Sequence, residues 1–157
     1  MNFEQAFEKL LGHEGGYVDH RADPGGATKY GISKRSYPQE DIVNLTLDRA
    51  KQIYWADFWL KARCDDIPEA IRFDVFDTAV NSGVGTAVRM VQRACGAQAD
   101  GILGPQTIAA ILAMDAHRLV KRFNGARLAF MTDLPTWPAF GRGWAKRIAS
   151  NLMAGEP

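Results

Sequence analysis

Residues 68–95, PEAIRFDVFDTAVNSGVGTAVRMVQRAC, contain two helix patterns with a glycine between them. Pro68 suits the first turn of a helix, because its φ is already helical and that turn does not need the missing N–H. Gly83 is a plausible end for this first helix, and VGTAVRMVQRAC predicts a second helix that stops at Gly96. This stretch therefore predicts a helical core.

Towards the N-terminus, two more helices and one irregular segment are expected. Apolar residues recur every three or four positions between residues 2 and 13, which predicts an amphipathic helix. Thr46 can cap another helix that continues to Trp59. Between them, YVDHRADPGGATKYGIS (residues 17–33) is rich in turn formers and predicts a loop or a small hairpin.

Towards the C-terminus, helix patterns resume after a glycine-rich connection, AQADGILGPQT (residues 97–107). Pro105 starts one helix, and Asp115 can cap a longer one. A last helix is expected from residue 141 or 144 to residue 153. The fold class that follows is mainly α, with a small β or loop lobe on the N-terminal side.

The length and composition fit one compact domain. A chain of 157 residues can bury one sizeable core, and 46% apolar with 24% charged residues is ordinary for a globular protein. We expect residues 1–157 to form a single domain with an internal boundary near Cys95. Residues 1–94 would then carry the chemistry, and residues 95–157 would form a purely helical half.

The charge and hydropathy of the chain argue against several partners. A formal net charge of +1 provides no overall basic field to attract nucleic acid or an anionic membrane. Acidic and basic residues interrupt the N-terminal apolar residues, unlike a signal peptide, and no apolar run approaches the roughly 20 residues that span a bilayer. We expect a monomer made in the cytoplasm, without a nucleic-acid partner or a membrane segment.

The cysteines and histidines are too scattered to predict a metal site. Cys64 and Cys95 lie far apart, as do His13, His20 and His117. We therefore expect two reduced structural thiols, no metal and no cofactor.

Glu14 best fits the chemistry of a glycosidic bond. It follows the predicted N-terminal helix and precedes two glycines, which leave room for a substrate. Burial against apolar side chains would raise the pKa of its carboxyl group and keep it protonated as a general acid. Asp19 and Asp23 follow in the next loop, and Thr28 comes five residues after Asp23. On spacing alone, however, solvated turn residues are the favoured interpretation of these acids.

Longer motifs resemble a known enzyme family. LGHEGGYVDHRADPGGATKYGIS (residues 11–33) resembles the N-terminal signature of glycoside hydrolase family 108, a group of bacterial and phage N-acetylmuramidases with EGGY as its hallmark. The motifs IYWADFW, FDVFDTAVNSGVGTAVRMVQRA, DGILGPQT and FGRGWAKRI also resemble this family, in the same order. From about residue 95 onward, the chain is similar to the associated peptidoglycan-binding region.

This resemblance implies a lysozyme-like helical fold and cleavage of the glycan bond between N-acetylmuramic acid and N-acetylglucosamine. It implies that Glu14 is the catalytic acid. A similarity to lambdoid phage lysozymes adds Asp23 as the second carboxylate, with Asp19 as the alternative, and Thr28 as a holder of the attacking water. If that water lies opposite Glu14, the reaction is a single displacement, and the two carboxyl groups should be about 6.5–9.5 Å apart, compared with about 5 Å for retention.

A peptidoglycan substrate calls for a groove with aromatic and polar side chains. The residues expected to bind substrate are Tyr17, Asp19, Tyr30, Tyr54, Asp77, Asn81 and Trp137. Some have a structural alternative: a core position for Tyr54, a local backbone cap for Asn81 and a supporting role for Asp77.

Two other functions remain possible from the sequence. A non-catalytic wall-binding module would fit DGILGPQT and the helical C-terminal half, although the intact EGGY favours catalysis. A lytic transglycosylase would use one Glu without an activated water. In each case the expected partner is the glycan strand of the periplasmic cell wall, reached through a holin as in phage lysis or through secretion machinery.

Overall fold

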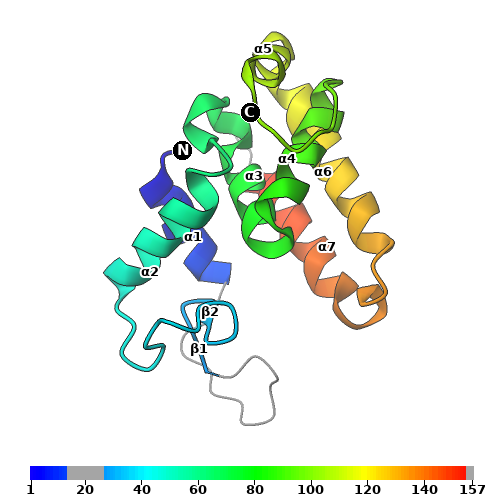
Figure 1. The fold of residues 1–157 in the computed structure, drawn as a ribbon. Helices are drawn as coiled ribbons and strands as arrows, with labels where there is room; N and C mark the ends of the chain where they lie inside the picture. Colours follow the sequence, from blue (N-terminus) through cyan, green and yellow to red (C-terminus); the bar gives the residue numbers. More distant parts are fainter. Residues whose placement is uncertain (14–26, 155–157) are drawn as a thin grey trace. The chain divides into compact units, whose positions relative to one another are not determined.

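The computed structural model describes residues 1–13 and 27–154 (Figure 1). In these residues seven α-helices accompany a single two-stranded antiparallel sheet, so the predicted mainly α fold with a small N-terminal β lobe is confirmed. The elements are α1 (Phe3–His13), β1 (Thr28–Lys29), β2 (Ile32–Ser33), α2 (Leu47–Tyr54), a π-helix (Trp55–Trp59), a 3-10 helix (Cys64–Asp66), α3 (Glu69–Ser82), α4 (Val84–Cys95), α5 (Pro105–Ala113), α6 (Ala116–Thr132) and α7 (Trp137–Ala154).

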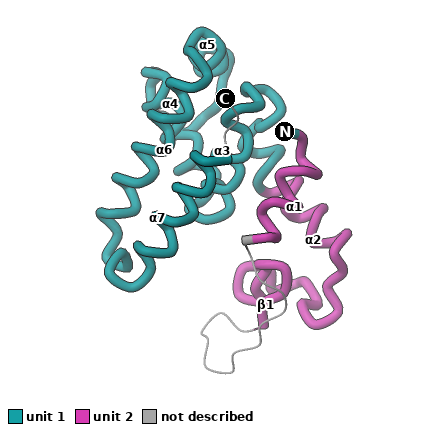
Figure 2. Tube along the Cα trace, turned by 180° about the vertical axis from the view of Figure 1, so that it is seen from behind, with its two compact units in different colours: residues 1, 58–157 teal, residues 2–57 magenta. Residues whose placement is uncertain are grey.

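The chain divides into two compact units (Figure 2). The N-terminal unit is Asn2–Asp57, and the C-terminal unit is Met1 together with Phe58–Pro157. Within the C-terminal unit, α3 and α4 contact each other extensively and both contact α6. The functional boundary expected near residue 95 stays a prediction.

In the N-terminal unit, α1 and α2 accompany the small hairpin. β1 pairs with β2 through Thr28 opposite Ser33 and Lys29 opposite Ile32. The connecting residues Tyr30 and Gly31 have φ of 51° and 77°, the left-handed conformations that a tight two-residue hairpin turn requires. Gly31 adopts this conformation without strain, so the predicted small hairpin forms around the Tyr-Gly pair.

The predicted cap at Thr46 is confirmed. Its side chain accepts a hydrogen bond of 3.2 Å from the backbone N–H of Arg49, which starts α2. The helical path continues to Trp59 as predicted, but its last turn is a π-helix instead of an α-helix.

In the C-terminal unit, α3 is the central helix. Its buried residues face in all directions, as expected for a helix surrounded by others: Ile71, Phe73, Asp74, Val75, Phe76, Asp77, Thr78 and Ala79. Its main helical neighbours are α4 and α6, and α7 packs against α6. Figures 1 and 2 both show α5 at one end of this unit and the turn between α6 and α7 at the other.

The DGILGPQT turn is organised by a buried amide. The Gln92 Nε2 donates to Asp100 Oδ1 at 2.7 Å and to Thr107 Oγ1 at 3.2 Å, while its Oε1 accepts from the Gly101 N–H at 2.9 Å. These bonds tie α4 to the start of α5, so this motif has a structural function in the fold.

The last helix, α7, begins at Trp137, earlier than the expected start at residue 141 or 144. Pro138 is tolerated because it lies in the first turn, where its N–H has no partner to lose. Gly141 lies in the helix interior, and a Cβ there would overlap the indole ring of Trp137. Its lack of a side chain is therefore a packing requirement and does not mark a helix end.

We predict opposite effects for two glycine-to-alanine changes in α7. Gly141→Ala should lower the free energy of unfolding by about 1–3 kcal/mol, because the added methyl displaces Trp137. Gly143→Ala, where nothing lies within 4 Å of the added Cβ, should raise it by about 0.5–1 kcal/mol. Urea unfolding followed by circular dichroism measures both; similar changes in the two variants would contradict the proposed contact.

Candidate functional site

Residues 14–26, which we call the candidate catalytic segment, lie between described residues at both ends. Glu14, Tyr17, Asp19 and Asp23 lie outside the described residues. The helix α1 ends at His13, directly before Glu14, and β1 begins at Thr28. α1 and the hairpin are therefore the described elements that flank this segment.

Tyr54 on α2 connects both of these ends. Its ring centre lies 5.5 Å from that of Phe7 on α1, and its Oη donates a 2.9 Å hydrogen bond to the carbonyl of Tyr30 in the hairpin turn. The side chain is only 2% exposed, which favours the core interpretation of Tyr54 over direct contact with a substrate. One tyrosine thus holds the helix before the catalytic segment and the hairpin after it.

The hairpin has further anchors within the N-terminal unit. The Lys29 Nζ donates to the carbonyl of Val43 at 3.1 Å and lies 5.6 Å from the centre of the Tyr30 ring. Thr28 and Tyr30 are both half-buried, so part of each side chain remains accessible. These positions are compatible with the roles predicted for the two residues, which stay predictions.

A second tyrosine, Tyr37, connects the chain that follows the hairpin to the π-helix at Trp55–Trp59. Its Oη donates a 3.0 Å hydrogen bond to Asp57 Oδ2. Burial, together with this bond and the carboxylate charge, raises the pKa of Tyr37 far above its ordinary value. The phenol therefore stays protonated and remains a hydrogen-bond donor at any physiological pH.

Asp77 lies inside the C-terminal unit, between three helices. Its Oδ2 is 2.6 Å from Arg127 Nη2 on α6, and its Oδ1 accepts from Arg147 on α7 at 2.5 and 2.9 Å. Burial by itself would raise the pKa of Asp77, but the charges and hydrogen bonds of the two arginines outweigh it and lower the pKa. With no exposed surface, the carboxylate has the supporting role that was the alternative to substrate contact.

The two other candidates in this unit also have local partners. The Asn81 Nδ2 donates to the Asp77 carbonyl at 2.6 Å, so the amide binds its own helix, although the residue is exposed at the surface. Trp137 is half-buried, with its ring centre 6.2 Å from that of Trp144. Arg147 connects α7 to α3 through its hydrogen bonds to Asp77.

Arg127 is a structural residue that the sequence reasoning missed. It is fully buried on α6, where Phe123, Arg127 and Met131 recur at intervals of four and are all buried. A cation in such an apolar stripe requires a buried counter-charge. That pattern was present in the sequence and could have predicted a partner carboxylate.

The described residues also show how the thiols and other polar groups are arranged. Cys64 and Cys95 are free thiols, and burial raises the pKa of Cys64. Among the residues that the structure describes, no three His, Cys, Asp or Glu side chains are grouped as a metal site requires. No helix in the same part of the chain is long and apolar enough to cross a membrane.

Comparisons with known proteins match the chain in two parts. Residues 7–83 match a family described as Glycosyl hydrolase 108, and residues 86–149 match one described as Predicted Peptidoglycan domain. The solved structure titled "Structure of Brucella abortus SagA" is similar over 98% of this chain and 92% of that chain, with 35% identity and a TM-score of 0.88. No curated protein matches the chain.

We predict that Tyr54→Phe loosens the hairpin. The variant keeps the ring contact with Phe7 but leaves the Tyr30 carbonyl without its donor, which should lower the free energy of unfolding by about 1 kcal/mol. Hydrogen exchange should accelerate in residues 28–33. Tyr37→Phe loses a bond to Asp57 and should leave exchange in the hairpin unchanged. Equal acceleration in both variants would contradict a specific role for Tyr54.

We predict that Asp77→Asn destabilises the protein by about 3–5 kcal/mol, because it leaves the buried Arg127 without a counter-charge. Because the pKa of Asp77 is lowered on folding, its contribution is present above about pH 4 and is lost as the pH falls through the lower folded value. Acid titration of the unfolding free energy should show this loss in the wild type and a reduced loss in the variant.

Asp66→Asn is the matched control for this prediction. Asp66 forms an ion pair with Arg63, and both side chains are more than 40% exposed. Its replacement should change stability by less than about 1 kcal/mol. A cost similar to that of Asp77→Asn would show that burial of the ion pair is not the source of the effect.

Proposed function

The chain belongs to glycosyl hydrolase family 108, and from this we propose that it is an N-acetylmuramidase that hydrolyses peptidoglycan. The observation that carries the proposal is the family match over residues 7–83, which includes Glu14 in EGGY. The following match to a peptidoglycan domain supports the same polymer as substrate. The bond cleaved is the one between N-acetylmuramic acid and N-acetylglucosamine, at the cell wall, where this polymer lies.

In the proposed mechanism, Glu14 is protonated and donates its proton to the glycosidic oxygen as the bond to the anomeric carbon breaks. Asp23 accepts a proton from a water held by Thr28, and this water adds to the anomeric carbon from the opposite face. The result is a single displacement with inversion, and it calls for carboxyl groups about 6.5–9.5 Å apart. Asp19 is the alternative second carboxylate.

The anchoring of the catalytic segment supports this mechanism. Acid and water must be held within a fraction of an ångström of their productive positions for the reaction to be fast. Tyr54 binds both α1, which leads into Glu14, and the hairpin that carries Thr28. Tyr54 therefore anchors the two described elements that flank the proposed catalytic residues.

We predict that Glu14→Gln lowers the rate of peptidoglycan cleavage by about 10²–10⁴-fold, because an amide cannot donate the required proton. Glu8→Gln, which removes an exposed carboxylate from α1, is the matched control and should keep wild-type activity. The measurement is mass spectrometry of muropeptides released from purified sacculi, with quantification of new reducing ends.

The products also test the competing functions. Products lighter by one water would identify a lytic transglycosylase. If the wild type and Glu14→Gln were equally inactive but both still bound sacculi, the protein would be a non-catalytic wall-binding module. Nuclear magnetic resonance of the anomer formed first distinguishes inversion from retention. The second carboxylate is identified by comparing Asp23→Asn with Asp19→Asn: it is the residue whose replacement lowers the rate of peptidoglycan cleavage more.

A further inference from the structure

An open groove lies between α1 and α2 in the N-terminal unit. Figures 1 and 2 both show these two helices side by side. The groove has a volume of about 660 Å³, within the range of about 300–1,000 Å³ that is typical of ligand sites. Its lining residues come from both helices and from the start of the π-helix: Phe3, Glu4, Asp48, Arg49, Lys51, Gln52, Trp55 and Ala56.

The groove lies at the start of α1, whereas the proposed catalytic acid follows the end of this helix. Phe3 and Glu4 belong to the first turn of α1, and Glu14 comes directly after its last residue, His13. At a rise of about 1.5 Å per residue, Glu4 and His13 are separated by about 13 Å along the helix axis. A ligand in the groove would therefore contact the first turn of α1, away from the end that leads to Glu14.

Trp55 gives the groove an exposed aromatic side. It is 44% exposed although it is a large apolar residue. Among the described residues, its indole N–H has no acceptor and its ring has no aromatic partner. Trp55 is also the first residue of the π-helix that follows α2, and π-helices are rare and frequently mark functional sites. The ring is therefore available to a bound partner.

The charged residues at the groove leave one negative charge uncompensated. Arg49 is held by Glu40 through hydrogen bonds of 2.6 and 3.2 Å. Lys51 on α2 forms an ion pair with Glu4 on α1. Asp48 is exposed and has no ion-pair partner in the part of the chain that the structure describes. Two cations and three carboxylates thus leave the charge of Asp48 available to attract a cation.

Asp48 and Trp55 lie on the same side of α2. They are seven residues apart, which is about two helical turns and about 10 Å along the axis. Helical side chains lean towards the N-terminus of their helix, so the ring of Trp55 leans towards Asp48. A long side chain with an apolar stem and a cationic end can therefore contact both residues.

We propose that this groove is a docking site for a protein partner, one arginine of which lies along Trp55 with its guanidinium on Asp48. Long cationic side chains bury their apolar stems and keep the charged end at a polar group. A guanidinium also stacks on aromatic rings and pairs with a carboxylate through two parallel hydrogen bonds, which an ammonium does not do. A protein segment fits better than a free cation, because Phe3 and Ala56 offer apolar contacts to neighbouring side chains. This docking is independent of the reaction proposed for Glu14.

The first experiment uses a capped pentapeptide, Ala-Leu-Arg-Leu-Ala, as the probe and the full-length, isotope-labelled protein as the receptor. In nuclear magnetic resonance spectra the peptide should shift the indole N–H signal of Trp55, which is assigned by its loss in Trp55→Phe. The same peptide with citrulline, an uncharged isostere of arginine, should bind about fivefold more weakly, and added salt should reduce the difference. Equal binding of the two peptides, or no shift with millimolar arginine peptide, would overturn the proposal.

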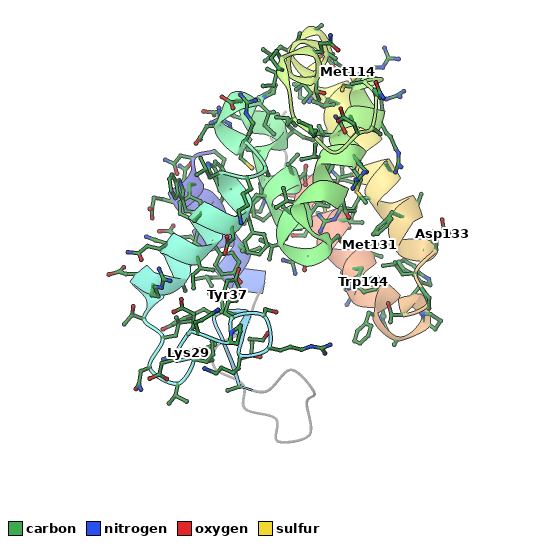
Figure 3. All side chains as sticks on the ribbon, in the orientation of Figure 1. Lys29, Tyr37, Met114, Met131, Asp133 and Trp144 are labelled. Atoms are coloured by element: carbon green, nitrogen blue, oxygen red, sulfur yellow. The ribbon has the colours of Figure 1, made fainter. Side chains whose placement is uncertain are left out.

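Two pairs of variants test the ring and the carboxylate, with binding followed on the backbone amides of Lys51 and Gln52. Trp55→Leu should lower the affinity for the arginine peptide about two- to fivefold, and Trp55→Phe, which keeps a ring, should lower it less. Asp48→Asn should lower the affinity by a similar factor. Asp133→Asn is the matched control, because it removes the same charge outside the groove, at the C-terminal end of α6 (Figure 3), and should bind like the wild type.

Circular dichroism checks that all four variants are folded. If Asp48→Asn and Asp133→Asn bound the peptide alike, Asp48 would not be the partner of the guanidinium. Equal affinities of Trp55→Leu and the wild type would exclude the ring contact in the same way.

Other ligands distinguish a protein partner from the alternatives. Capped arginine without neighbouring residues should bind more weakly than the pentapeptide, and equal binding would contradict a protein segment as the occupant. Shifts of Trp55 that are as large with spermidine would make the groove a general cation site. Shifts that are larger with soluble muropeptides would make it part of the substrate cleft. Either result would overturn the proposal.

Cleavage of sacculi is measured separately. Trp55→Leu and Asp48→Asn should release muropeptides at the wild-type rate, because the groove lies at the other end of α1 from Glu14. A loss as large as that of Glu14→Gln would show that the groove belongs to the catalytic site. Absence of muropeptides from the wild-type protein, with arginine-specific binding of the peptide, would overturn the proposed function and leave the docking site.

Discussion

The helical bundle depends on one buried carboxylate. Asp77 on the central helix α3 receives a guanidinium from α6 and another from α7, so a single charge sets how three helices meet. Removing two charges from water is costly, and their attraction compensates only if the partners are close and well oriented. The ion pairs therefore contribute less to net stability than to specificity: any other register of α6 or α7 would leave a buried charge without a partner.

The elements that flank the proposed catalytic segment, α1 and the β-hairpin, are joined by a different and neutral contact. The ring of Tyr54 packs against Phe7 on α1, and its hydroxyl donates a hydrogen bond to the Tyr30 carbonyl in the hairpin. One side chain thus contacts both elements. Scaffold elements that begin and end a functional loop reduce the number of conformations the loop can adopt.

Different sides of α7 have different roles. Arg147 faces inward and serves the fold through Asp77, whereas Phe140, Arg142 and Lys146 face the solvent. Gly141 has no side chain, and this leaves room for the ring of Trp137 to pack beside Trp144. Residues 116–154 contain seven basic residues and one acidic residue, but the net charge of the whole chain is only +1, because acidic residues elsewhere compensate for them.

The sequence by itself determined most of the helices, a loop or small hairpin within residues 17–33, and the family, because caps, prolines, glycines and the EGGY motif act over a few neighbouring residues. It misplaced the start of α7, since Gly141 has the same local signature whether it begins a helix or accommodates Trp137 in a helix interior. Only the tertiary structure decided the roles of Tyr54 and Asp77. Their partners lie 24 to 70 positions away, and nothing in the local pattern says which distant residue a buried hydroxyl or carboxylate will meet.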